Sequence, residues 1–198
     1  LQRIIDLDYF SKKNKNLYNK DFKFLIENFN SDKAENYINQ YNKPLNRAKV
    51  LEKGHAYHPY YEKIFSKKKK NISNILELGS FKGNAAAAFF FYFPNAKIIS
   101  ADLFPDLYRY KSSRIKNIYL DKSKEKQLEE KILKKKMKFD IIIEDASHYL
   151  KDQIISLFVL FESINPGGYF IVEELEFPNV RKDMNIKNEK PTLKDIIE

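Results

Sequence analysis

The chain has 198 residues, 43% of them hydrophobic and 15% aromatic, which is enough for one domain with a real core and excludes a disordered chain. Zero cysteines exclude disulfides, thiolate zinc sites and a cysteine nucleophile. No stretch approaches the roughly 18 apolar residues of a membrane span and the amino terminus lacks a signal-peptide core, so we expect a cytoplasmic protein without a membrane span.

The formal net charge of +9 would suit an anionic partner such as nucleic acid. Much of this charge is diffuse lysine, however, and the run at 67–70 lies just before a predicted strand. A solvated connection explains that run most simply, so nucleic acid is the less favoured partner.

Residues 1–50 are predicted to form a helical amino-terminal extension, with residues 51–198 forming the main domain. One apolar stripe lies within 22–29 and another is formed by Tyr37, Ile38 and Tyr41. Helix formation is expected to break at 42–44, because residues before a proline are pushed out of the helical region.

The next segment, 53–62, concentrates two of the three histidines and three tyrosines around a glycine and a proline. It could be a packed turn leading into a helix at 60–66. It could also be a loop that closes over a ligand, with His55, Tyr57 and His58 as polar contacts.

From residue 73 onward, predicted strands and helices alternate. Strands are expected at 74–78, 97–101, 118–120, 139–143 and 169–172, helices at 83–93, 122–136 and 150–164, and a turn at 166–168. Such alternation predicts an α/β fold with a doubly wound, mostly parallel sheet, and the uninterrupted apolar run at 139–143 suits a strand buried on both faces.

The turn after the first of these strands reads Glu77-Leu78-Gly79-Ser80-Phe81-Lys82-Gly83. It matches neither the dinucleotide fingerprint nor a phosphate-binding loop. An acid in the turn would repel a pyrophosphate but suits a cationic ligand or an amino group. An ordinary strand-to-helix turn is the alternative.

Acids also end the next two strands. Asp102 could bind ribose hydroxyls, with Phe104 covering an adenine face, and Asp121 could accept a hydrogen bond from the adenine amino group. Taken singly, each acid could instead be a helix cap or a turn residue.

The apolar run at 139–143 ends in Glu144 and Asp145, and His148 follows. Glu173 and Glu174 come one crossover helix and one strand later, so parallel pairing would bring them beside Asp145. Three carboxylates suit Mg²⁺, Mn²⁺ or Ca²⁺, and a histidine can take a proton near neutral pH. The alternatives are solvated acids at a strand end and a structural histidine.

The turn at 77–83 resembles the first motif of class I S-adenosylmethionine-dependent methyltransferases, Glu/Asp-x-Gly-x-Gly-x-Gly, with Phe81 in place of the middle glycine. The runs Phe-Asp-Ile-Ile-Ile-Glu-Asp-Ala-Ser-His and Pro-Gly-Gly-Tyr-Phe-Ile-Val-Glu-Glu-Leu, together with 54–62, are similar to the metal-dependent macrocin/mycinamicin-type sugar O-methyltransferases. This similarity spans roughly residues 53–198.

The resemblance implies a Rossmann-like fold and two cofactors, S-adenosylmethionine and a divalent metal, Mg²⁺ by preference. It assigns Asp145, Glu173 and Glu174 to the metal and makes His148, beside Asp145, the base. The residues expected to contact the cofactor are Glu77, Gly79, Ser80, Gly83, Asp102, Leu103, Phe104, Asp121, Lys122 and Glu144.

The expected function is therefore metal-assisted methylation of a sugar hydroxyl on a small-molecule or saccharide substrate. A nucleic-acid methyltransferase and a non-catalytic binding or interaction domain are the alternatives, and homo-oligomer formation stays open. Class I folds normally close with two further edge strands, which this sequence lacks before Glu198, so a chain truncated at its carboxyl end is expected.

Overall fold

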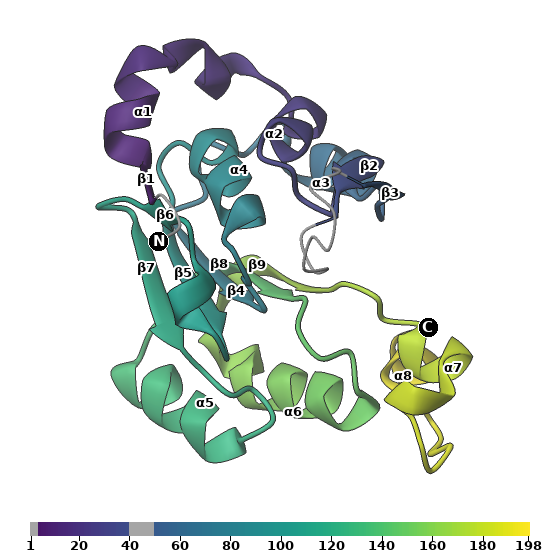
Figure 1. Ribbon diagram of the computed structural model, residues 1–198. Coiled ribbons are helices and arrows are strands. Elements are labelled where there is room, and N and C mark those ends of the chain that lie inside the picture. Colours follow the sequence, from purple (N-terminus) through teal and green to yellow (C-terminus); the bar gives the residue numbers. More distant parts are fainter. Residues whose placement is uncertain (1–3, 40–49) are drawn as a thin grey trace.

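The computed structural model describes residues 4–39 and 50–198. Its centre is a five-stranded parallel sheet with the strand order β7-β5-β4-β8-β9 (Figure 1). The strands are β4 (Asn74–Leu78), β5 (Lys97–Asp102), β7 (Ile115–Tyr119), β8 (Phe139–Glu144) and β9 (Ile164–Val172). The predicted doubly wound α/β fold is confirmed. Because the strand order reverses between β4 and β8, a crevice opens at their carboxyl ends.

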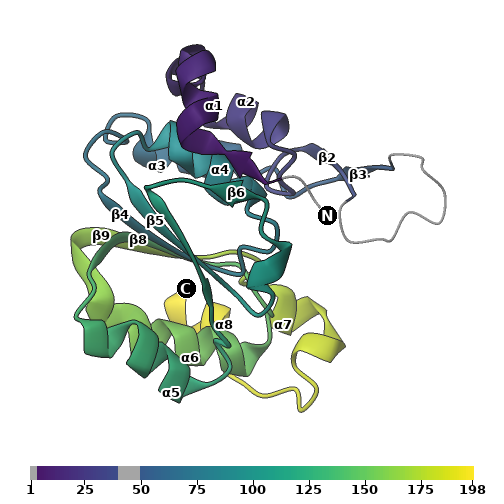
Figure 2. The ribbon, with the colours of Figure 1, turned by 60° about the vertical axis from the view of Figure 1, so that its left-hand side comes forward.

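The sheet is buried because both faces are covered by helices (Figures 1 and 2). Along β8, Ile141 and Ile143 join the core beneath α4 (Asn84–Tyr92), whereas Ile142 joins the core beneath α5 (Glu125–Lys131) and α6 (Leu150–Leu160). Alternating side chains of one strand thus enter opposite cores, which explains the unbroken apolar run.

The amino-terminal segment packs on the α4 side of the sheet. It contains β1 (Ile5–Asp6), α1 (Leu7–Lys13), a 3-10 helix (Lys15–Asn19) and α2 (Phe22–Asn28). The Phe22 ring stacks on Phe89 of α4, with centroids 5.6 Å apart and planes 6° apart. The predicted stripe within 22–29 is therefore helical and buried, as expected.

The prediction of a helix for the second apolar stripe is wrong at Tyr37 and Ile38. Residues 36–38 form β2 (Asn36–Ile38), which pairs antiparallel with β3 (Leu51–Lys53). The Tyr37 hydroxyl donates a hydrogen bond of 3.0 Å to Glu52 across this pair. A segment of three residues is too short for its periodicity to distinguish a strand from a helix. Tyr41 and the predicted break at 42–44 lie outside the described residues.

Helix α3 (His58–Phe65) follows, with proline in its first turn. The short strand β6 (Tyr110–Lys111) pairs in parallel with β1. The turn predicted at 166–168 lies instead inside β9, whose pairing with β8 has a register shift at this point. An irregular strand accommodates the glycines that we expected to form a turn before a strand at 169–172.

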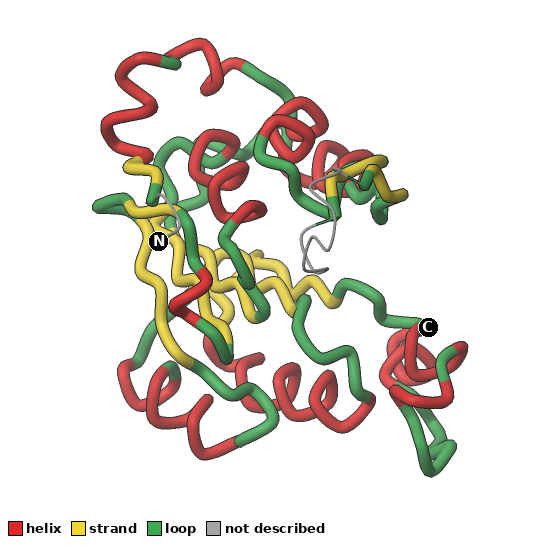
Figure 3. Tube along the Cα trace, in the orientation of Figure 1, coloured by secondary structure: helices red, strands yellow, loops and turns green. Residues whose placement is uncertain are grey.

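The chain ends with α7 (Phe177–Val180) and α8 (Leu193–Ile197), the latter capped by Thr192. Short 3-10 segments occur at Pro105–Leu107, Leu133–Lys135, Phe161–Ser163 and Lys182–Met184. Strands, helices and connecting loops are distinguished in Figure 3. Among the described residues, none of the helices has both the length and the apolar character needed to cross a membrane.

Candidate active site

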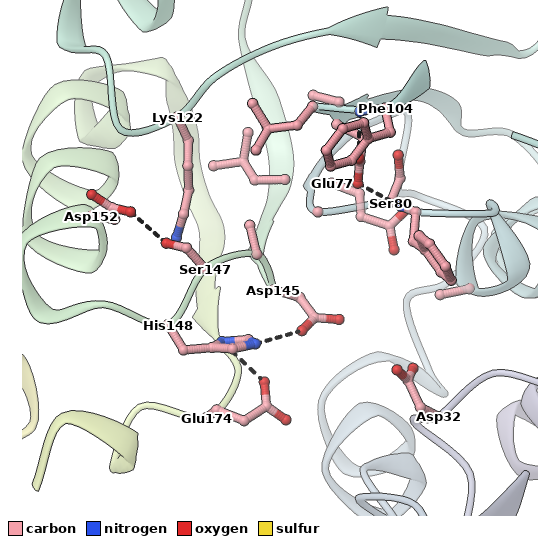
Figure 4. Close-up of a pocket in the computed structure, with 18 of the residues that line it drawn as sticks. Asp32, Glu77, Ser80, Phe104, Lys122, Asp145, Ser147, His148, Asp152 and Glu174 are labelled. Carbon is pink, nitrogen blue, oxygen red and sulfur yellow. Dashed lines mark hydrogen bonds and ion pairs between the residues drawn. The ribbon is translucent and has the colours of Figure 1, made fainter. Parts of the chain in front are cut away.

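A cavity of about 830 Å³ lies at the carboxyl ends of the parallel strands (Figure 4). The turns after β4, β5, β7 and β8 line it, and Asp32, His55 and Arg181 add side chains from outside the sheet. This volume is within the range of small-molecule and cofactor sites. The topology thus brings the segments predicted to hold a ligand to one place.

Gly79 allows the β4–α4 turn to approach β8 closely. Its φ is +90°, and a Cβ atom there would lie 1.9 Å from the carbonyl oxygen of Asp145. The next special position is Phe81, which has a φ of 42° despite its large side chain. Its N–H donates to Asp102 Oδ2 at 2.7 Å, so a hydrogen bond holds the backbone where the resemblance expects a glycine.

Two acids flank this turn. Asp102 lines the cavity and also accepts the Phe104 N–H at 2.8 Å, so its carboxylate is held in a fixed orientation. Glu77 is buried, and burial raises its pKa to about 8, with Asp145 and other acids adding to the effect against the opposing charge of Lys33. Bound positive charge would favour the ionised form of Glu77.

The remaining predicted cofactor contacts divide into two groups. Ser80, Leu103, Phe104, Asp121 and Lys122 all line the cavity. Gly83 lies behind the turn, where a Cβ atom would come within 2.5 Å of the Tyr108 ring, and Glu144 lies in the protein interior, ion-paired with Lys122. Gly83 and Glu144 are therefore placed to support the cavity wall.

Asp145, His148 and Glu174 converge beside the cavity (Figure 4). One possible ligand atom from each residue lies within 4.8 Å of the other two. In the described residues, this group has the geometry of a metal site. His148 Nε2 is 3.9 Å from Asp145 Oδ1, and His148 Nδ1 is 3.5 Å from Glu174 Oε2. The backbone at His148 and Glu174 is left-handed, with φ of 57° and 50°, a strained conformation typical of functional sites.

Glu173 is not a member of this group in the described residues, although it lies beside Asp145. The bend at Glu174 separates the two side chains, and Glu173 accepts a hydrogen bond from the Tyr61 hydroxyl at 2.7 Å and forms an ion pair with Lys33. Lys33 also lies 2.5 Å from Asp145 Oδ2. Neither Lys33 nor Tyr61 was identified from the sequence, because a lysine in a polar loop and a tyrosine on a helix carry no local pattern.

The 53–62 segment contributes unequally. The Tyr57 hydroxyl donates to Glu174 Oε1 at 2.7 Å, and His55 Nδ1 lies 3.1 Å from the same oxygen while its ring stacks on Tyr57. His55 lines the cavity, but His58 lies outside the lining, 3.8 Å from Glu35. The structure therefore brings His55 to the cavity and Tyr57 to Glu174, whereas His58 lies away from both, and closure of this segment over a ligand stays a prediction.

Burial sets the charge states of the cluster. It raises the pKa of Glu174 to about 8, with Asp145 as the next cause, and lowers the pKa of His148 to about 4 against the attraction of Asp145. His148 is thus neutral at pH 7. Asp145 keeps a lowered pKa because Lys33 outweighs the effect of burial.

These residues fit a divalent cation. Glu174 Oε2 and His148 Nδ1 are buried and have no hydrogen-bond partner among the described residues. Buried polar atoms are normally paired, so the open Glu174 oxygen near Asp145 and His148 indicates a missing ligand. Oxygen-rich sites of this kind prefer Mg²⁺, Mn²⁺ or Ca²⁺.

Comparison with solved structures identifies the fold. The chain superimposes on MycE methyltransferase from the mycinamycin biosynthetic pathway, in complex with Mg, SAH and mycinamycin VI, with a TM-score of 0.70 over 90% of this chain and 46% of that chain, at 19% identity. The architecture is therefore that of the class I S-adenosylmethionine-dependent methyltransferases.

Comparison with curated sequences finds O-methyltransferases, although no family model matches the chain. It is 26% identical over 128 residues to mycinamicin VI 2''-O-methyltransferase of Micromonospora griseorubida, which covers 61% of this chain and 32% of that protein. It is 27% identical, with the same coverage, to a tetracenomycin-C rhamnosyl 3'-O-methyltransferase of Streptomyces olivaceus. The chain thus spans about a third of the length of the curated relatives it matches.

Proposed function

We propose that this chain carries the cofactor- and metal-binding part of an S-adenosylmethionine-dependent O-methyltransferase that acts on a sugar hydroxyl with the help of Mg²⁺. The observation that carries the proposal is the convergence of Asp145, His148 and Glu174 at the wall of a cofactor-sized cavity. The relatives named above support a glycoside acceptor. A surface-polysaccharide precursor would offer the same hydroxyl chemistry.

In this proposal the sheet edge binds the cofactor. The backbone at Gly79 and Ser80 meets the methionine part, Asp102 takes the ribose hydroxyls and Asp121 lies near the adenine. Glu77 is buried, and its pKa of about 8 leaves it mostly protonated at pH 7 without a ligand. A cationic sulfonium or amino group bound beside it would favour its ionised form.

The second half of the site activates the acceptor. Asp145 and Glu174 would hold the divalent cation, whose positive charge would lower the pKa of a sugar hydroxyl bound beside it. His148 is neutral at pH 7, and its Nδ1 faces Glu174, which leaves Nε2 to accept the hydroxyl proton. The cavity holds donor and acceptor together, which supplies much of the rate enhancement by orientation.

The proposal includes a cytoplasmic location and a saccharide rather than nucleic acid as the acceptor, and it leaves homo-oligomer formation open. The alternative of a basic nucleic-acid methyltransferase predicts RNA binding that weakens steeply with salt. A non-catalytic interaction domain would bind neither S-adenosylmethionine nor S-adenosylhomocysteine.

Calorimetric titration with S-adenosylhomocysteine tests the cofactor half. We expect one site, weakened about 10- to 100-fold in Asp102→Asn, because charged hydrogen bonds to the ribose would be lost. His148→Ala should keep this binding but lose methyl transfer. Absence of binding in the wild type would refute the cofactor assignment, and full activity in His148→Ala would refute its role as the base.

A further inference from the structure

Lys33 places a buried positive charge inside the acid cluster. It lies on the loop between α2 and β2, and only 1% of its surface is exposed. Its ammonium group contacts both Asp145 and Glu173, which are 112 and 140 residues away in the sequence. Lysine is almost never this buried unless it is paired, so the contact is built into the fold.

The backbone around Lys33 is fixed from both sides. The carbonyl groups of Asp32, Lys33 and Ala34 accept N–H bonds of 2.8, 2.9 and 3.1 Å from His55, Tyr57 and Ala56, respectively. Gly54 makes this approach feasible, because a Cβ atom there would lie 2.1 Å from the Ala34 oxygen. The ammonium group is therefore held in place and not free to sample other partners.

The hydrogen bonds divide the carboxylate oxygens into two sets. Both oxygens of Glu173 are occupied, Oε1 by the Tyr61 hydroxyl and Oε2 by Lys33. Asp145 gives Oδ2 to Lys33 and turns Oδ1 toward His148. Glu174 gives Oε1 to Tyr57 and leaves Oε2 without a partner in the described part of the chain.

We propose that Lys33 is a buried counter-ion that stays paired with Glu173, so that only Asp145 Oδ1 and Glu174 Oε2 provide carboxylate ligands for the metal. This inference rests on the proposed metal site and changes its ligand set from three acids to two. In this proposal Lys33 does not touch the metal and acts only by keeping Glu173 in an ion pair.

The alternative is that Glu173 is a direct ligand. A cation bound at Glu173 Oε2 would lie beside the Lys33 ammonium group, and the two positive charges would repel each other. Glu173 is also outside the group of possible ligand atoms that lie within 4.8 Å of one another in the described residues. Relieving the repulsion would require Lys33 to leave Glu173. Leaving a buried ammonium group or hydroxyl unpaired is costly. The arrangement in the structure avoids this cost. The buried acids can carry several negative charges, and one ammonium group together with a divalent cation balances these charges better than either cation alone.

The test is a Mn²⁺ titration, followed by electron paramagnetic resonance, of the full chain and four variants. A loss of affinity on the order of 100-fold or more is expected for Glu174→Gln. Glu173→Gln should cost no more than about tenfold, the lower end of the losses seen for residues outside the ligand set. Lys33→Met should bind Mn²⁺ more tightly than the wild type, because it frees Glu173. The double variant Lys33→Met/Glu173→Gln should return close to the affinity of the wild type.

Thermal unfolding of the same samples shows whether each variant is folded. Lys33→Met should melt lower than the wild type without metal and gain more from added Mn²⁺, whereas the double variant should recover much of the melting temperature. Equal losses of affinity in Glu173→Gln and Glu174→Gln, or weaker binding in Lys33→Met, would overturn the inference. Neither result would affect methyl transfer by the wild type, and absence of transfer would refute the proposed function without changing the Mn²⁺ ranking.

Discussion

Replacing Gly79 with alanine should destabilise the chain through one identifiable contact. Two costs add at this position. A residue with a side chain at a φ of +90° costs about 1–2 kcal/mol, and the new Cβ atom would lie 1.9 Å from the Asp145 carbonyl oxygen, so the ends of β4 and β8 must separate. Such overpacking typically costs about 1–3 kcal/mol. The expected total is about 2–5 kcal/mol in the free energy of unfolding.

Gly167→Ala is the matched control. Gly167 has a φ of +77°, but nothing lies within 4 Å of the Cβ position, so only the backbone cost of about 1–2 kcal/mol applies. Urea unfolding followed by circular dichroism measures both variants. Because Asp145 moves with the contact, Gly79→Ala should also weaken Mn²⁺ binding, and Gly167→Ala should not. Equal destabilisation of the two variants would refute the account of the β4–β8 contact.

Three further predictions follow from buried polar groups. Lys122→Met should lower the free energy of unfolding, measured by urea unfolding, by about 3–5 kcal/mol, because Glu144 becomes an unpaired buried acid. The double variant Lys122→Met/Glu144→Gln should recover most of this loss. No recovery would argue against the ion pair. Burial raises the pKa of Glu77 from 4.5 to about 8, so the ligand-free wild type should lose up to about 1.4 kcal/mol of stability per pH unit between these values. Glu77→Gln lacks this loss, and its advantage over the wild type should grow with pH across that window; parallel curves would contradict the shift. Tyr57→Phe should cost about 1–2 kcal/mol, measured by thermal unfolding, because it removes a 2.7 Å hydrogen bond to Glu174, and an unchanged stability would show that this bond contributes little.

Much of the fold and half of the site could be predicted from the sequence, because they follow from periodicity. The apolar run of β8 places Asp145 at the carboxyl edge, and parallel pairing with β9 brings Glu174 beside it. Asp102 could be placed in the same way. The strand that a residue follows therefore places Asp102, Asp145 and Glu174 at the cavity, although it does not tell Glu174 from Glu173.

The rest depends on contacts between distant segments. Lys33 is one of many lysines in polar surroundings, and only the folded chain brings it to Asp145 and Glu173. The left-handed backbone at Glu174, which separates it from Glu173, belongs to a residue type that rarely adopts it. The strand β2 has three residues, too few for a period of two to be told from a helix.

The most direct test of the account is transfer of a labelled methyl group from S-adenosylmethionine to a panel of rhamnosyl and other deoxysugar glycosides, with Mg²⁺ or with excess chelator. We expect label on a sugar oxygen, its loss in chelator, and its recovery when Mg²⁺ is restored. Undiminished transfer in excess chelator would contradict the role of the metal. Absence of transfer to any glycoside, by a chain that binds S-adenosylhomocysteine, would contradict the sugar as acceptor.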